Sequence, residues 1–215
     1  MTWIVLGIGC AQAGSPTGAS PTAMAPVPAP GPGQEVAVFA GGCFWCLEAD
    51  FDKLPGVIAT TSGYAGGKEE NPTYEQVAGH HTGHYEALHV VYDPAVVPYQ
   101  GVLDYFWRHV DPTDAGGQFC DRGDSYRTAV FPVNDAQAKA AEASKAALTA
   151  SGWLPAPIVT PILPAQRFWP AEQYHQDFHH TNPGRYDSYR AGCRRDATVA
   201  RVWAKAPAAK APAAK

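Results

Sequence analysis

The 215-residue sequence lacks an excess of basic residues, because 16 Lys and Arg stand against 20 Asp and Glu and the formal net charge is -4. Nucleic-acid-binding proteins usually carry a basic surface, so we expect no nucleic-acid partner. The sequence also lacks a long apolar run. The stretch from Trp3 to Gly9 is too short to cross a bilayer, so we expect no transmembrane span. No internal repeat is visible.

Low-complexity stretches lie at both ends of the chain. Residues 14–33 are nearly all Ala, Pro, Gly, Ser and Thr, a composition that cannot bury enough apolar area to fold, and we interpret them as a disordered linker. Residues 205–215 form a low-complexity Ala/Pro/Lys tail. The remaining chain, residues 34–204, is long and apolar enough for one folded domain, which we expect to be a monomer.

Residues 1–13 resemble a signal segment. Their apolar run is followed by Ala11-Gln12-Ala13, which fits a cleavage site and favours export to the periplasm or cell envelope. Gly9-Cys10 also resembles a lipoprotein processing site, so a lipid anchor at Cys10 is an alternative. No Lys or Arg precedes the run, which favours a third interpretation, a cytoplasmic protein whose start is misassigned.

Hydrophobic periodicity and capping residues predict an α+β fold, a single mixed sheet with flanking helices, because strands and helices alternate without a regular βαβ repeat. Strands are expected at 36–40, 57–63, 85–92, 128–131 and 158–163, the last near a sheet edge because Pro161 interrupts it. Helices are expected at 46–54, 102–111, 134–152 and 172–180. The segments 65–83 and 113–125 are predicted loops, and 184–204 is predicted to be irregular.

Cys43 and Cys46 form a C-x-x-C motif between the first predicted strand and helix. A helix N-terminus lowers the pKa of a cysteine, so Cys43 is a candidate reactive thiol. A zinc site is disfavoured because no second C-x-x-C is present, and covalent haem because Leu47 stands where His is needed. We therefore expect no metal. A thioredoxin-like redox helix and a module held by structural disulfides stay open on the motif alone.

The sequence around Cys43 resembles the type A peptide methionine sulfoxide reductases (MsrA), and further matches follow in the family's order. They are Gly42-Cys43-Phe44-Trp45, Gly63-Tyr64-Ala65-Gly66-Gly67, Asn71-Pro72-Thr73-Tyr74, Thr82-Gly83-His84-Tyr85-Glu86, Val91-Tyr92-Asp93-Pro94, the run from Gln118 to Arg127, the run from Ala171 to Gln176, and Asn182-Pro183. The resemblance covers residues 36–203. It implies a two-layer, ferredoxin-like sandwich, and an enzyme that reduces methionine S-sulfoxide, both protein-bound and free, to repair oxidised proteins.

The resemblance also implies roles for individual residues. Cys43 attacks the sulfoxide sulfur and leaves as a sulfenic acid. Burial on a strand raises the pKa of Glu86, which suits a proton donor to the sulfoxide oxygen. The implied substrate-binding residues are Phe44 and Trp45 for the methyl group, Tyr74 and Tyr126 for the oxygen, and Asp121 for the polar side of the pocket.

A second thiol must then convert the sulfenic acid into a disulfide, which an external dithiol such as thioredoxin reduces, so no bound cofactor is expected. Asp187 stands where some relatives carry a resolving cysteine. We favour Cys46 over Cys193 for this role and place Cys120 third; a relay from Cys46 to Cys193 stays open. The alternative function is general thiol–disulfide exchange.

Overall fold

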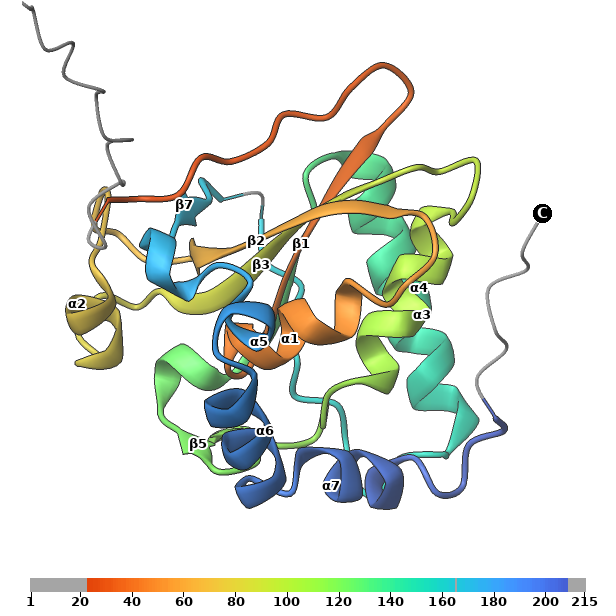
Figure 1. The fold of residues 1–215 in the computed structure, drawn as a ribbon. Coiled ribbons are helices and arrows are strands. Elements are labelled where there is room, and N and C mark those ends of the chain that lie inside the picture. The colour runs from red at the N-terminus through yellow and green to blue at the C-terminus, as the bar shows by residue number, and fades with distance from the viewer. Residues whose placement is uncertain (1–22, 165, 209–215) are drawn as a thin grey trace, which may run out of the picture.

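A five-stranded sheet lies at the centre of the protein, in a computed structural model that describes residues 23–164 and 166–208 (Figure 1). The strands follow one another in the order β6-β1-β3-β2-β7, and each neighbouring pair is antiparallel. Parallel pairing occurs at an isolated bridge between Val130 and Ile162. The strand bounds are β1 Glu35–Gly41, β2 Val57–Ala65, β3 Tyr85–Tyr92, β6 Thr128–Phe131 and β7 Trp169–Pro170.

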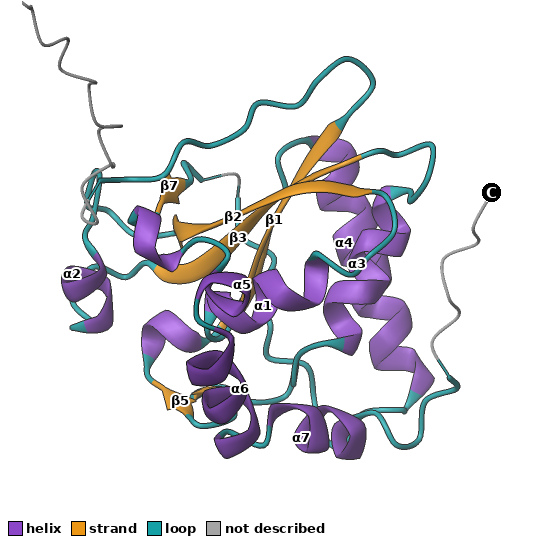
Figure 2. Ribbon diagram, in the orientation of Figure 1, coloured by secondary structure: helices purple, strands orange, loops and turns teal. Residues whose placement is uncertain are grey.

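Helices and a small hairpin surround this sheet (Figure 2). The hairpin pairs β4 Gly117–Gln118 with β5 Asp121–Arg122 and is followed by the 3-10 turn η1, Asp124–Tyr126. The α-helices are α1 Phe44–Phe51, α2 Tyr74–Ala78, α3 Tyr99–Arg108, α4 Asp135–Ser151, α5 Phe178–Thr181, α6 Pro183–Gly192 and α7 Arg195–Val202, and η2 spans Gln173–His175. Within the described ranges, no helix is long and apolar enough to cross a membrane.

The two faces of the sheet are covered differently. Side chains alternate across a strand, so Ala37 and Phe39 of β1 join the main core, which also holds residues of α1, α3 and α4. Val38 and Ala40 face the other side and pack in a smaller cluster with the coil residue Leu163. The result is one helix layer on one sheet layer, which places the end of β1 beside α1.

The predicted α+β class is confirmed, and several elements agree closely with their predicted bounds. β3 and β6 have the predicted bounds, and α4 has Asn134 as its N-cap and Gly152 as a left-handed C-cap. Asn134 Oδ1 accepts a hydrogen bond from the backbone N–H of Gln137, the third residue of the helix.

Other predicted elements are wrong. Residues 158–163 form no strand; the segment lies along the edge strand β6 through the Ile162 bridge, so only its edge location is correct. Residues 184–204, predicted to be irregular, form most of α6 and all of α7. The predicted loops 65–83 and 113–125 contain α2 and the β4–β5 hairpin, so a second sheet joins the single sheet that was expected.

The predicted linker and tail lie partly outside the described residues, and the predicted signal segment and Cys10 lie wholly outside them. The described end of the linker contacts the domain, because the backbone N–H of Ala25 donates to Ala171 O and that of Gln173 donates to Ala23 O. The described part of the tail also contacts the domain, through a hydrogen bond from Arg108 Nη2 to Pro207 O.

Candidate active site

Cys43 is the N-cap of α1 and is separated from the end of β1 by Gly42 alone. Gly42 makes this sharp turn possible. Its φ is +80°, which L-residues rarely adopt, and a Cβ atom there would lie 2.5 Å from Gln118 Cβ. The backbone N–H of Cys46 donates to Cys43 O at 3.1 Å, so both cysteines belong to the same first turn. Both thiols are free and buried.

Glu86, the second residue of β3, points its carboxyl group at the start of α1. Its Oε2 accepts a hydrogen bond of 2.9 Å from the backbone N–H of Phe44. The side chain is buried, and this burial raises the pKa of Glu86 from 4.5 to about 8; the nearby Asp121 carboxylate and Cys46 act in the same direction. The group is therefore protonated at neutral pH, as the sequence predicted from a carboxyl group on a buried strand.

The first residues of α1 form an aromatic wall. Trp45 stacks on Phe178 of α5 at 3.7 Å between ring centroids, and its indole N–H donates to Nδ1 of His175 at 3.1 Å. Phe44 is buried and lies against the rings of Tyr64 and His175. The orientation of Trp45 is thus fixed from two sides by residues of the C-terminal third of the chain.

Two tyrosines lie opposite this wall. Tyr74 begins α2, whose N-cap Thr73 forms a capping box with Gln76, and Tyr126 ends η1. Both side chains line the same cavity, and burial raises the pKa of both phenols. Glu172 holds Tyr74 in place, because its Oε1 accepts the backbone N–H of Tyr74 at 2.9 Å. Its Oε2 accepts the hydroxyl proton of Tyr64 at 3.0 Å.

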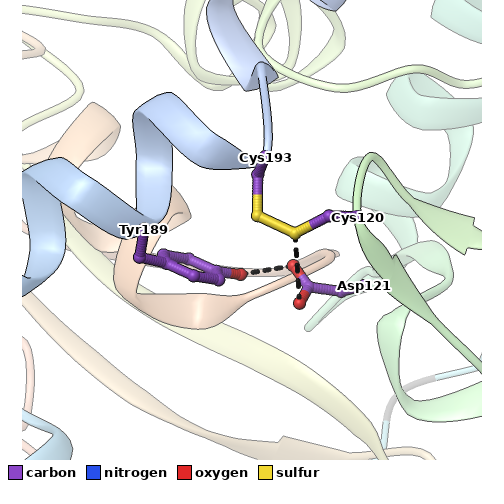
Figure 3. Close-up of a disulfide and its surroundings, with 4 residues drawn as sticks. All are labelled: Cys120, Asp121, Tyr189 and Cys193. Carbon is purple, nitrogen blue, oxygen red and sulfur yellow. Dashed lines mark hydrogen bonds between the residues drawn. A yellow bond between two sulfur atoms is a disulfide. The ribbon is translucent and has the colours of Figure 1, made fainter.

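Asp121 closes the polar side of the site from the β4–β5 hairpin. Its Oδ2 accepts a short hydrogen bond from the hydroxyl group of Tyr189 on α6 (Figure 3). Partial burial raises the pKa of Asp121, while the Tyr189 hydrogen bond and the charge of Arg195 lower it.

These side chains line one small cavity of about 70 Å³. The lining consists of all seven residues predicted as nucleophile, proton donor and substrate contacts, together with Tyr189; they are Cys43, Phe44, Trp45, Tyr74, Glu86, Asp121, Tyr126 and Tyr189. The cavity combines a thiol, a protonated carboxyl group and phenol hydroxyl groups with an aromatic wall. It therefore suits a small group that has an apolar methyl and a polar oxygen on one atom.

The two thiols of the C-x-x-C motif differ in acidity. Burial raises the pKa of Cys43 well above its usual range, and the hydrogen bond to Cys46 and the charge of Glu86 add to this. The sequence predicted the opposite direction from the helix N-terminus, but desolvation outweighs the helix dipole at this depth. The hydrogen bond with Cys43 lowers the pKa of Cys46, and Arg195 and Arg190 contribute in the same direction.

The other two described cysteines form a disulfide, Cys120–Cys193 (Figure 3). Cys120 is exposed in the turn of the β4–β5 hairpin, and Cys193 is the C-cap of α6. Of the two candidate resolving cysteines, Cys46 therefore lies beside Cys43, whereas Cys193 is bonded to Cys120. The sequence reasoning did not anticipate this pairing.

Sequence reasoning also missed Tyr189 and Glu172 as parts of the site. Tyr189 lies in a segment predicted to be irregular, and nothing local marks it. Glu172 lies in the Ala171–Gln176 match, but only the fold brings it 2.9 Å from the backbone nitrogen of Tyr74. Two histidines before Glu86 form hydrogen bonds with neighbouring loops. The Nδ1 atom of His84 accepts the backbone N–H of Gly67, and the Nδ1 atom of His80 lies 3.1 Å from Ser125 Oγ.

Comparisons with known proteins agree on one family. A family model described as peptide methionine sulfoxide reductase matches residues 35–207. The peptide methionine sulfoxide reductase MsrA of Bacillus licheniformis is 52% identical over 172 residues, which cover 80% of this chain and 95% of the relative.

Solved structures of MsrA proteins have the same fold. Methionine sulfoxide reductase A of Corynebacterium diphtheriae matches with a TM-score of 0.64 and 32% identity, over 75% of this chain and 89% of that one. Reduced Mxr1 of Saccharomyces cerevisiae matches with a TM-score of 0.67 and 30% identity, over 72% and 90%. Mxr1 has also been solved in complex with Trx2. The chain belongs to the peptide methionine sulfoxide reductase family and is similar to its MsrA members.

Proposed function

We propose that this protein is an oxidoreductase that reduces the S epimer of methionine sulfoxide, in proteins and as the free amino acid, to methionine. The observation that carries the proposal is the shared cavity, in which the Cys43 thiol and the Glu86 carboxyl group face the Trp45 wall. The S epimer and repair of oxidised proteins come from the family resemblance.

The first step is attack of Cys43 on the sulfoxide sulfur. Protonated Glu86 gives its proton to the sulfoxide oxygen, and hydrogen bonds from Tyr74 and Tyr126 orient that oxygen. The sulfur–oxygen bond and the transient bond between the two sulfurs then break as the hydroxyl group passes to Cys43, and the proton that the Cys43 thiol loses replaces the one given by Glu86. Methionine sulfur gains two electrons, and Cys43 becomes a sulfenic acid. The aromatic wall of Phe44 and Trp45 holds the methyl group and excludes water.

The second step is resolution by Cys46, which releases water and forms a Cys43–Cys46 disulfide. Two observations support Cys46 over Cys193. The Cys46 side chain lies in the same buried cluster as Cys43, and its pKa is lowered, which favours the thiolate form that acts as a nucleophile. Cys193 is not available while it is bonded to Cys120. Cys193 would resolve only after that disulfide opens, which makes it the second candidate.

The third step is reduction by an external dithiol. The complex of yeast Mxr1 with Trx2 supports a thioredoxin-like reductant for this chain as well.

From the sequence alone, we also propose that the protein is exported and acts as a monomer. Amino-terminal sequencing of the mature protein tests export, and an intact Met1 end would contradict it.

Turnover with each epimer of methionine sulfoxide and a dithiol tests the main proposal. Methionine should form from the S epimer, and Cys43→Ser should abolish its formation. The alternative, a general disulfide-exchange protein, predicts rapid reduction of insulin disulfides and no methionine from either epimer.

A further inference from the structure

Two histidines and an aspartate gather at the end of α1 opposite Cys43. Asp52 is the C-cap of α1, and His179 and His180 lie side by side on α5, with 3.9 Å between their ring centroids. Each of the three side chains offers a possible ligand atom, and these atoms all lie within 4.8 Å of one another. The Nε2 atom of His179 and the Oδ2 atom of Asp52 are 3.3 Å apart.

We propose that Asp52, His179 and His180 bind one Zn²⁺ ion, at a site independent of the proposed function. Imidazole nitrogens and carboxylate oxygens bind zinc at about 2.0–2.2 Å, so two of them around a tetrahedral ion lie roughly 3.3–3.6 Å apart. The separation of His179 Nε2 and Asp52 Oδ2 falls in this range. A water molecule would take the fourth position. The sequence-based expectation of no metal rests on the cysteine pattern, which does not involve these residues.

The carboxylate of Asp52 is oriented from two sides. Thr60 Oγ1, on β2, donates a hydrogen bond of 2.7 Å to Oδ1, which leaves Oδ2 for the ion. Carboxylates that bind metals are typically held by such a hydrogen bond. The backbone N–H of Asp52 donates to Glu48 O at 2.9 Å, so the residue stays in the last turn of α1. Its position is therefore set by α1 and β2 together.

The turn at the start of α5 holds the two histidines together. Asp177 is its N-cap, with a φ of +51°, and its backbone oxygen accepts the backbone N–H of His180 at 2.9 Å. The side chain of His179 is only 10% exposed, and its Nδ1 atom is buried without a hydrogen-bond partner among the described residues. Buried polar atoms are normally paired, so the burial of this imidazole is a cost that a bound cation would offset.

The chemistry of these ligands selects the metal. Asp177 precedes the histidine pair in sequence and Lys53 follows Asp52, so the neighbouring charges are of opposite sign. Ca²⁺ and Mg²⁺ prefer several oxygen ligands, which the cluster does not offer. Imidazole suits zinc, copper, iron and nickel, and of these zinc accepts four-coordinate sites of nitrogen and oxygen without a redox change.

A bound ion would join the helix of the proposed nucleophile to the residue that supports Trp45. α5 begins at Phe178, whose ring stacks on Trp45 at 3.7 Å. Asp52 ends the same helix that Cys43 caps. Zinc should therefore hold α5 on α1 and stabilise the aromatic wall, because a ligand that binds the folded state favours it.

Competition with a chromophoric chelator measures zinc binding to the full chain, after its metal has been removed. Reductant is omitted, so that the Cys120–Cys193 disulfide stays closed. The background Cys10→Ser, Cys43→Ser and Cys46→Ser removes the other three cysteines, since thiolates bind zinc themselves. We expect one Zn²⁺ per chain at micromolar free zinc, and less than one would overturn the proposal.

Single variants in this background locate the ion. His180→Ala and Asp52→Asn should each weaken binding by at least about tenfold. Both positions are exposed, so neither change should prevent folding. His81→Ala is the matched control, because His81 is an exposed histidine outside the cluster. Equal binding in His180→Ala and His81→Ala would contradict the site.

Thermal unfolding with and without zinc is the second readout. Zinc should raise the Tm of the background protein and of His81→Ala, and should leave the Tm of His180→Ala unchanged. An equal rise in His180→Ala would place the ion elsewhere and overturn the proposal. Neither measurement uses methionine sulfoxide, so a failure here is distinct from a failure of the proposed function.

Discussion

The backbone N–H of Phe44 donates a hydrogen bond of 2.9 Å to Oε2 of Glu86, and this contact joins the first turn of α1 to the start of β3. The residue before Phe44 is Cys43, the proposed nucleophile, so the proposed proton donor is anchored beside it. The contact leaves the second carboxyl oxygen of Glu86 available to the cavity.

Glu86→Gln should abolish most of the activity while leaving the fold intact, because a carboxamide can accept the Phe44 hydrogen bond but cannot give up a proton. We expect kcat to fall roughly 100- to 10,000-fold. The exposed Glu142→Gln on α4 is the matched control. In the wild-type protein, kcat/KM should fall as pH rises through about 8, where Glu86 ionises. A full rate in Glu86→Gln would show that another group protonates the oxygen.

Glu48 should make the stability of the protein depend on pH. Burial raises its pKa from 4.5 to about 8, and Asp52 and Asp177 add to this. Between pH 4.5 and about 8, Glu48 therefore keeps its proton in the folded state and loses it in the unfolded state. The free energy of unfolding is therefore highest below pH 4.5 as far as this group is concerned, and it falls by up to about 1.4 kcal/mol per pH unit as pH rises toward about 8.

Glu48→Gln should flatten this slope, since a neutral amide does not titrate, while the contribution of Glu86 persists. Urea unfolding at several pH values measures the slope, with Glu142→Gln as the exposed control. Equal slopes in the wild-type protein and Glu48→Gln would contradict the conclusion that burial raises the pKa of Glu48.

Gly42→Ala should destabilise the protein by at least about 2 kcal/mol, because a side chain at φ +80° is strained and its Cβ would meet Gln118 Cβ at 2.5 Å. Gly184→Ala on α6 is the control, since nothing lies within 4 Å of its added Cβ. That variant should be neutral or gain up to about 1 kcal/mol. Thermal unfolding of both variants checks the pair, and similar losses would argue against a special conformation at Gly42.

Phe178→Ala should loosen Trp45, because it removes the ring on which the indole stacks at 3.7 Å. We expect a loss of roughly 3–5 kcal/mol in stability and a larger effect on KM than on kcat, since the proposed role of Trp45 is to contact the substrate methyl group and not to transfer protons. Phe178→Leu retains apolar contact and should be milder in both measurements. A drop in kcat alone would assign Trp45 a different role.

The elements predicted well from the sequence are those specified by local signals. The apolar residues of β3 predict a strand, and Asp93-Pro94 predicts its end. The caps Asn134 and Gly152 predict both ends of α4. The predicted catalytic and substrate-binding residues come together in one cavity, and four of the family motifs supply all seven of them. α6 and α7 were missed because their apolar residues are few and follow no clear helical period. Their contacts are tertiary: Arg195 of α7 is buried and donates to Gly41 O and His109 O.

The disulfide and Tyr189 could not be read from the sequence for the same reason. Cys120 and Cys193 are 73 residues apart, and their pairing depends on where α6 ends. Tyr189 reaches the site only because α6 packs beside the hairpin that carries Asp121. The predicted strand at 158–163 failed because Pro157 and Pro161 lack backbone N–H groups, so the segment can make only scattered sheet contacts.

Peptide mapping by mass spectrometry after a single turnover tests the central claim most directly. The protein is mixed with one equivalent of methionine S-sulfoxide without reductant, and free thiols are then blocked in acid. We predict one equivalent of methionine, a new Cys43–Cys46 disulfide and an intact Cys120–Cys193 disulfide. A Cys43–Cys193 bridge with Cys120 free, or methionine formed while both Cys43 and Cys46 remain thiols, would contradict the account.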